Sequence, residues 1–115
     1  MTYLETIDLW TAKPPGPGKF LADLLSKIDI TQEEFADAIG TSRFTVNQIV
    51  NGKRTVTTAM AFRIAKATNT SPEVWLNLQR DVDAFEAYSK IKDELEGVRV
   101  VRPKRTEAEM VVALD

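Results

Sequence analysis

Helix start and stop signals follow one another so closely between residues 17 and 96 that few folds other than a helical bundle fit them. The clearest start is at Thr31, whose side chain is suited to cap a first turn, with Glu34 three residues later completing a capping box. Ile30 and Phe35 flank this turn at the spacing of a hydrophobic staple. Gly40 then supplies the residue type that most often ends a helix. The sequence therefore predicts a short helix between Thr31 and Gly40.

The apolar residues of the same region recur at helical spacing, which predicts four more helices. Serine or threonine stands at the expected beginning of three of them, and a proline in the first turn strengthens the last. These helices are expected from Phe20 to Ile28, over 43–50 after a cap at Ser42, from Thr57 or Thr58 onward, and from Ser71-Pro72-Glu73 to about Leu95. The fold class is thus predicted to be all-α, with five helices.

Proline and glycine mark the two borders of this helical body. Residues 13–18 read Lys-Pro-Pro-Gly-Pro-Gly, a turn-rich hinge, and Gly97 and Pro103 interrupt the other end. We therefore divide the chain into an N-terminal arm (1–16), a helical domain (17–96) and a C-terminal tail (97–115). A chain of 115 residues has room for one compact core of this kind.

Both ends carry apolar residues of their own. The tail alternates weakly over residues 98–102, a pattern that would suit a short strand. The arm is too rich in large apolar residues for a free segment, so it is expected to pack on the domain, on a second subunit or on a partner. Its apolar residues are Tyr3, Leu4, Ile7, Leu9 and Trp10.

Composition excludes several classes of function. The chain has no histidine and no cysteine, which removes thiol nucleophiles, imidazole bases, disulfides and the common structural zinc sites. We expect no catalytic residues, no metal and no cofactor, and hence a binding protein. No apolar run approaches the ~20 residues of a membrane span, and the first residues do not resemble a signal peptide. The expected location is the cytoplasm.

Net charge misleads unless it is divided by position. The whole chain carries −2, which at first argues against a nucleic-acid partner. Residues 38–72, however, hold five cations and no acidic residue, whereas 1–37 and 73–97 each sum to −4. An acid-free block is the part of the chain that a phosphate backbone would tolerate. Chance alone can also produce such a block, so charge leaves both interpretations open.

Residues 32–51 combine two short predicted helices with a three-residue turn. Small Ala36 stands where the helices would cross, and Gly40 where the turn needs a positive φ. Ile39, Val46 and Ile49 are placed to hold the two helices at a fixed angle. This is the pattern of a helix-turn-helix; an ordinary corner between two helices of a structural bundle is the alternative.

The outward face of the second helix favours DNA binding over that alternative. A merely solvated face would carry glutamate and lysine, but this one carries residues that read base edges. Arginine pairs with guanine, asparagine and glutamine pair with adenine, and an apolar ring contacts the thymine methyl group. Residues at helix starts and just after the second helix are placed to grip phosphates. The nine candidate DNA-binding residues are Gln32, Ser42, Arg43, Phe44, Asn47, Gln48, Asn51, Lys53 and Arg54.

Four segments together resemble one known family. They are Thr41-Ser42-Arg43, Asn47-Gln48-Ile49-Val50-Asn51-Gly52-Lys53-Arg54, Thr57-Thr58-Ala59-Met60-Ala61 and Thr70-Ser71-Pro72-Glu73-Val74-Trp75-Leu76-Asn77-Leu78-Gln79. The chain resembles the HigA-type (VapI-like) antitoxins of the XRE (Cro/C1) helix-turn-helix superfamily over about residues 15–90. That resemblance implies a lambda-repressor-like DNA-binding domain, to which the arms at both ends are additional. It also carries the nine candidate positions over as DNA-facing.

The resemblance implies partners as well as a fold. Family members pair with a small HigB-type ribonuclease toxin, neutralise it by direct binding and repress their own operon as homodimers on palindromic operator DNA. A stand-alone XRE-type transcription regulator without a toxin is the alternative, since nothing within the chain separates the two. A third reading is a protein-interaction module whose helix-turn-helix no longer binds DNA.

The last predicted helix is more apolar than one small bundle needs. Trp75 is expected to fill the core. We therefore predict that part of this helix forms a symmetric dimer contact, made by Val74, Leu78, Val82 and Phe85.

Two departures from the family pattern concern the site. Pro15-Gly16-Pro17-Gly18 stands where the group usually has His-Pro-Gly-Glu, which is expected to alter the start of the first helix. Phe44 replaces a residue that is commonly polar, so the position is expected to make an apolar contact in place of a hydrogen bond to a base.

Overall fold

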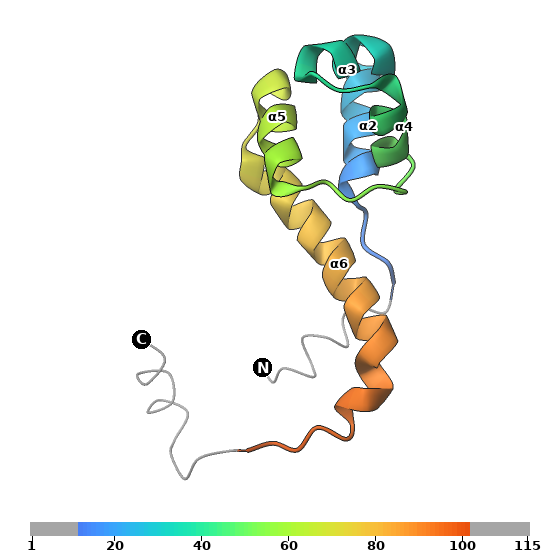
Figure 1. Ribbon diagram of the computed structural model, residues 1–115, viewed down its shortest axis with the longest axis vertical. Helices are drawn as coiled ribbons and strands as arrows, with labels where there is room; N and C mark the ends of the chain where they lie inside the picture. The colour runs from blue at the N-terminus through green and yellow to red at the C-terminus, as the bar shows by residue number, and fades with distance from the viewer. Residues whose placement is uncertain (1–11, 102–115) are drawn as a thin grey trace, which may run out of the picture.

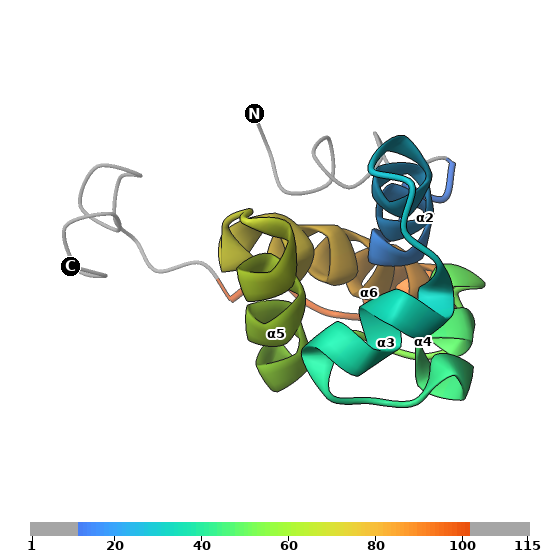
Figure 2. The ribbon, with the colours of Figure 1, turned by 90° about the horizontal axis from the view of Figure 1, so that it is seen from above.

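The structure, a computed structural model, describes residues 12–101, and this part of the chain folds into five helices and no strand. The prediction of an all-α fold with five helices is confirmed. The helices are α2 (Pro17–Lys27), α3 (Gln32–Ile39), α4 (Arg43–Val50), α5 (Thr58–Thr68) and α6 (Pro72–Leu95). Figure 1 shows α2 to α5 grouped at one end, with α6 leading away from them. Seen from above, α3 lies between α4 and α5 (Figure 2).

Two interpretations of the chain ends have different outcomes. The apolar residues of the arm between Tyr3 and Trp10 lie outside the described residues. The tail is described as far as Val101, and residues 98–101 form no strand there. A strand needs a neighbour for its backbone hydrogen bonds, and no other described residue of the chain is in a strand. The prediction of a short strand is therefore wrong for residues 98–101.

Side-chain caps begin four of the helices, as the sequence predicted. Thr31, Ser42 and Thr57 each accept a hydrogen bond at 3.1 Å from the backbone N–H three residues later. Ser71 accepts one at 3.2 Å from the backbone N–H of Glu73. Each such cap satisfies one of the backbone donors that a helix start leaves without a partner. The cap of α5 is thus Thr57, which decides between the two candidates that the sequence left open.

Local backbone geometry around α3 agrees with the prediction in one respect and differs in another. Gly40 ends α3 with φ at 74°, a left-handed conformation that costs glycine little. The return bond of the capping box is different from the expected one. The Glu34 carboxylate accepts from the Thr31 hydroxyl at 3.1 Å, whereas the usual capping box directs this side chain to the backbone N–H.

Trp75 lies at the centre of the core and is fully buried. It is the only residue of α6 in the most buried class. The Phe20 ring of α2 meets the Trp75 ring edge to face, with centroids 5.2 Å apart, and the Trp75 Nε1–H donates to the Thr70 hydroxyl at 2.7 Å. The prediction that Trp75 fills the core is confirmed. The other largest fully buried side chains are Leu21, Ile49, Ile64 and Val46.

Gly18, in the first turn of α2, brings that helix against the end of α4. A Cβ at this position would overlap the backbone carbonyl oxygen of Ile49 and would lie 2.8 Å from that of Val50. Two backbones approach this closely only where one residue lacks a side chain. The glycine of the hinge therefore fixes how the first helix supports α4, in a segment where the sequence departs from the family pattern.

Candidate nucleic-acid interface

The angle between α3 and α4 is held by a small apolar contact. Ala36 and Ile39 of α3 and Val46 and Ile49 of α4 are all buried. The left-handed Gly40 turns the chain between the two helices. The four residues that the sequence placed inside the helix-turn-helix are therefore inside it, and the pair forms a rigid support for the outer face of α4.

The outer face of α4 presents the predicted residues. Arg43, Phe44 and Asn47 are exposed, and Gln48 is half-buried beside them. Phe44 has 65% of its surface exposed, which is unusual for a large apolar side chain in a small domain. Its position within a row of arginine and amide side chains suits contact with a base rather than with the core.

Three amide side chains connect the start of α3 to the middle and the end of α4. Asn47 Nδ2 donates to Gln32 Oε1 at 3.2 Å, which joins the start of α3 to the middle of α4. Asn51, at the end of α4, donates from Nδ2 to Asn47 Oδ1 at 3.1 Å and to the Asn47 backbone carbonyl at 2.9 Å. The structure thus brings three of the nine candidates into one hydrogen-bonded chain.

A second pair joins α4 to the segment that follows it. Arg54 Nε donates to Gln48 Oε1 at 3.0 Å. Both residues are candidates from the sequence, and the bond holds the guanidinium next to the recognition helix. Arg54 therefore lies against the outer face of α4.

The Ser42 hydroxyl is engaged within the protein. It accepts from the Thr45 backbone N–H and donates to the Thr45 hydroxyl at 3.0 Å. Thr45 was not among the candidates from the sequence, and its place three residues after the cap is what brings it to the Ser42 hydroxyl.

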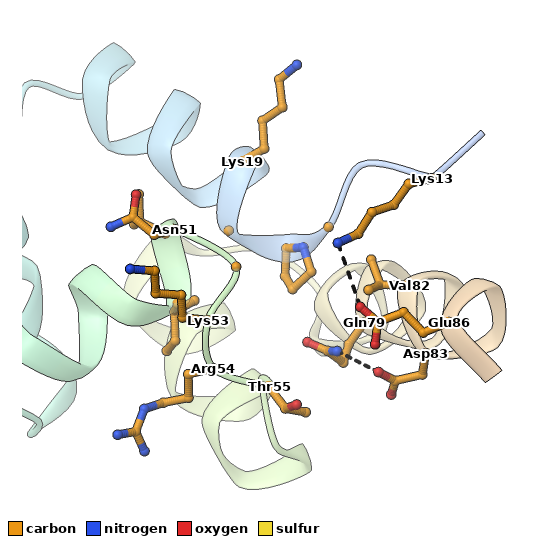
Figure 3. Close-up of a pocket in the computed structure, with 16 residues that line it drawn as sticks. Lys13, Lys19, Asn51, Lys53, Arg54, Thr55, Gln79, Val82, Asp83 and Glu86 are labelled. Carbon is orange, nitrogen blue, oxygen red and sulfur yellow. Dashed lines mark hydrogen bonds and ion pairs between the residues drawn. The ribbon is translucent and has the colours of Figure 1, made fainter. Parts of the chain in front are cut away.

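The segment after α4 borders a hollow of about 590 Å³ between the hinge, α4 and α6. Figure 3 shows Asn51, Lys53 and Arg54 on one side of it, with Asp83 and Glu86 of α6 on the other. The two acidic side chains already have partners within the protein, because Lys13 Nζ lies 3.7 Å from Glu86 and Gln79 donates to Asp83 at 2.8 Å. The basic side continues to the outer face of α4.

Two further residues of this region were missed by the sequence interpretation. Gln79 Oε1 accepts from the Val56 backbone N–H at 2.9 Å, which ties the segment after α4 to α6. Lys19 is exposed and lines the same hollow, because its neighbour Gly18 lies against the end of α4. The signal for Lys19 was its place directly after a glycine that allows close contact.

The four residues predicted for a dimer contact have different surroundings. Val74 and Leu78 pack against the core of their own chain. Val82 faces the hinge, since a Cβ on Gly16 would lie 3.2 Å from its Cγ2. Phe85 is half-buried and, unlike Val74 and Leu78, is not among the residues packed against the core cluster.

The described residues show neither a metal site nor a membrane helix. Between residues 12 and 101 no three histidine, cysteine or acidic side chains are gathered so as to hold a metal ion. No helix in that part of the chain is long and apolar enough to cross a membrane. The interface described above consists of amide, hydroxyl, guanidinium and amino groups with one exposed ring.

Comparison with known proteins places this arrangement in a family. The helix-turn-helix family model matches residues 21–75. The HTH-type transcriptional regulator YbaQ of Escherichia coli is 36% identical over 78% of this chain and 80% of its own. Antitoxin HigA-1 of Vibrio cholerae is 32% identical over 76% of this chain and 83% of its own.

A solved structure agrees with these relatives. The antitoxin HigA of Pseudomonas aeruginosa, solved with the higBA promoter, has a TM-score of 0.73 and 31% identity to this chain. The match covers 77% of this chain and 99% of that one. The chain therefore belongs to the XRE-type helix-turn-helix family of DNA-binding proteins that includes the HigA antitoxins.

Proposed function

We propose that this chain is a sequence-specific DNA-binding antitoxin that represses its own operon and neutralises a HigB-type ribonuclease toxin by direct binding. The observation that carries the proposal is the outer face of α4, where exposed Arg43, Phe44 and Asn47 adjoin the basic segment 53–54 without an acidic residue. The P. aeruginosa relative was solved with the higBA promoter, which supports operator DNA as the ligand of this chain.

In this proposal the nine candidate residues divide into two roles. Residues of α4 face base edges, and Lys53 with the helix starts faces the phosphates. Lys19 and Thr45 lie beside the phosphate-facing residues and are proposed to contact phosphates as well. Neutralisation of the toxin is stoichiometric and steric, because the chain lacks the histidine and cysteine on which most catalytic inactivation would depend. The acidic surface of α6 complements a basic RNA-binding toxin.

The proposal is tested with the native operon. The chain, tagged and expressed with its neighbouring genes, should copurify with a small basic protein in a fixed ratio, and the purified chain should shift its own upstream DNA. A shift without a copurifying toxin would favour the second candidate function, a stand-alone transcription regulator. The identity with the regulator YbaQ is the observation that favours that candidate. Failure of both measurements would refute both functions.

Replacing Arg43 by alanine should weaken operator binding by about 1–3 kcal/mol, or roughly 5- to 150-fold, because a bidentate contact to guanine contributes that much discrimination. Fluorescence anisotropy with labelled operator measures the effect. The exposed Arg80 of α6 lies outside the outer face of α4, so Arg80→Ala is the matched control. Equal losses in the two variants would show that Arg43 acts only through its charge.

Lys53→Ala should weaken binding to every DNA sequence about equally. A phosphate contact releases condensed counterions, so its loss should reduce the slope of log K against log[salt] by about one unit. Titrations at several salt concentrations, on operator and on unrelated DNA, give both quantities. An unchanged slope with altered sequence preference would instead place Lys53 on a base.

Dimer formation is proposed to use the end of α6 that extends beyond the other helices. Tyr88, Ile91 and Leu95 follow Phe85 at spacings that keep all four on one side of the helix. Ile91 keeps 40% of its surface exposed. Because Val74 and Leu78 are used in the core, the contact predicted from the sequence is expected to shift toward these later residues.

Ile91→Asp should weaken the dimer about tenfold or more, because it would bury a charge without a partner. Sedimentation velocity at several protein concentrations measures the change. Lys90→Asp places the same acidic side chain on the side of the helix opposite this face and should leave the dimer nearly intact. A wild-type protein that is monomeric at micromolar concentration would contradict the proposed contact.

A further inference from the structure

We infer that the hydrogen bonds among Gln32, Asn47, Asn51, Gln48 and Arg54 fix the direction of the recognition amides, so that Gln48 prefers guanine to adenine. The inference rests on the proposed DNA binding and concerns which base is read. Residue type alone would assign glutamine and asparagine to adenine. The contacts of these side chains favour a different assignment.

The bond between Arg54 and Gln48 determines which end of the Gln48 amide is left for DNA. A guanidinium has donors and no acceptor, so its partner 3.0 Å from Nε must be the amide oxygen of Gln48. The opposite end, Nε2, is a donor. The Gln48 side chain is half-buried, which limits the rotation of its amide while the bond to Arg54 persists.

The orientation of the Gln32, Asn47 and Asn51 amides follows in the same way, starting from a backbone carbonyl. Asn51 contacts the backbone carbonyl of Asn47 at 2.9 Å, and a carbonyl only accepts, so the contacting atom is Nδ2. That nitrogen also lies 3.1 Å from the Asn47 side chain, which must present Oδ1 to it. Asn47 Nδ2 is then the atom that faces Gln32, 3.2 Å away, and Gln32 must present Oε1.

The two sets of bonds direct the oxygens of Gln32, Asn47 and Gln48 toward neighbours within the protein, whereas Asn51 bonds through its nitrogen and keeps an acceptor. The Gln48 and Gln32 oxygens and the Asn47 oxygen accept from neighbours within the protein, while Gln48 Nε2, Gln32 Nε2 and the terminal nitrogens of Arg54 remain as donors. Asn47 has its oxygen and its nitrogen engaged, which makes it a positioning residue that holds α4 against the start of α3. Around Gln48 and Arg54 the face therefore presents mainly donors, which suit phosphates and base acceptors.

Guanine and adenine differ in just this respect. The major-groove edge of guanine has two adjacent acceptors, N7 and O6, whereas adenine has one acceptor beside an N6 donor. Bidentate recognition of adenine needs the Gln48 oxygen as the acceptor for the N6–H donor. That oxygen keeps a second lone pair, but the positively charged guanidinium of Arg54, bonded to it at 3.0 Å, disfavours the approach of another donor. The geometry therefore favours guanine at the base pair that faces Gln48, with the Arg54 guanidinium as the neighbouring donor.

The test is a selection of bound sequences from a random double-stranded DNA library with four proteins. Gln48→Ala identifies the base pair read by this residue, as the position whose preference is lost. Arg54→Met removes the donor and keeps an unbranched side chain, so the Gln48 oxygen is released. Lys53→Met removes the adjacent exposed cation and is the control for loss of charge. Thermal unfolding by circular dichroism checks that each variant is folded.

The wild type should select guanine at the mapped position. Arg54→Met should raise the ratio of adenine to guanine there by about tenfold, whereas Lys53→Met should lower the affinity for all sequences and leave the ratio unchanged. Wild-type selection of adenine, or an Arg54→Met variant that loses affinity without changing the ratio, would overturn the inference and leave the proposed function standing. A wild type that enriches no sequence would refute the proposed function and the inference together.

Discussion

Replacement of Trp75 by alanine is expected to lower the free energy of unfolding by about 3–5 kcal/mol, the range for removing a large aromatic side chain from a core. The side chain has no exposed surface and lies against the Phe20 ring of α2. Small domains are stabilised by only about 5–15 kcal/mol in total, so the variant should be partly unfolded at moderate temperature. Urea denaturation followed by circular dichroism measures the loss.

Two variants separate packing from other causes. Trp75→Phe loses the 2.7 Å bond to Thr70 but keeps an aromatic ring in the core. It should therefore lower the free energy of unfolding clearly less than the alanine variant does. Phe20→Ala removes the ring that contacts Trp75, but Phe20 is 43% exposed and should also cost less. A Trp75→Ala variant as stable as Phe20→Ala would show that the core does not depend on the indole.

Gly18→Ala is expected to cost about 3 kcal/mol, at the upper end of the usual penalty for overpacking. The added methyl group would overlap the Ile49 carbonyl oxygen. Backbone atoms at the end of a helix cannot turn aside as a side chain can, so α2 and α4 must move apart. Because α4 carries the proposed base-reading face, operator affinity should fall together with stability.

Gly16→Ala is the matched control for this change. Its Cβ would meet only the Val82 side chain, at 3.2 Å, and a valine methyl group can shift by the few tenths of an ångström required. The expected loss is below about 1 kcal/mol, the scale of replacing glycine at a helix cap. Equal losses at the two glycines would refute the close contact between α2 and α4.

The fold was largely predictable because its determinants are local. Thr31, Ser42 and Ser71 each act within three residues along the chain, so a short stretch of sequence contains the whole interaction. The choice between Thr57 and Thr58 could not be made in this way, because both residues are threonine and suit the cap equally. In the structure Thr57 has the extended backbone of a cap, with φ at −71° and ψ at 165°.

The candidate interface was predictable as a set of residues and not as a set of contacts. Helical spacing placed Asn47 and Gln48 on the outer face, but their partners Gln32 and Arg54 are fifteen and six residues away. Those pairs depend on the angle between α3 and α4 and on the path after α4, which periodicity does not encode. For the same reason the apolar excess of α6 did not reveal that Val74 and Leu78 serve their own core.

The uninterrupted course of α6 has a consequence for how its length can change. The helix spans 24 residues with Trp75 in the core near one end and the proposed dimer face near the other. One inserted residue between them would rotate that face by about 100° and advance it by about 1.5 Å. Insertions and deletions there should therefore be accepted only in steps close to a whole turn, which keep the two recognition helices of a dimer in phase with the operator.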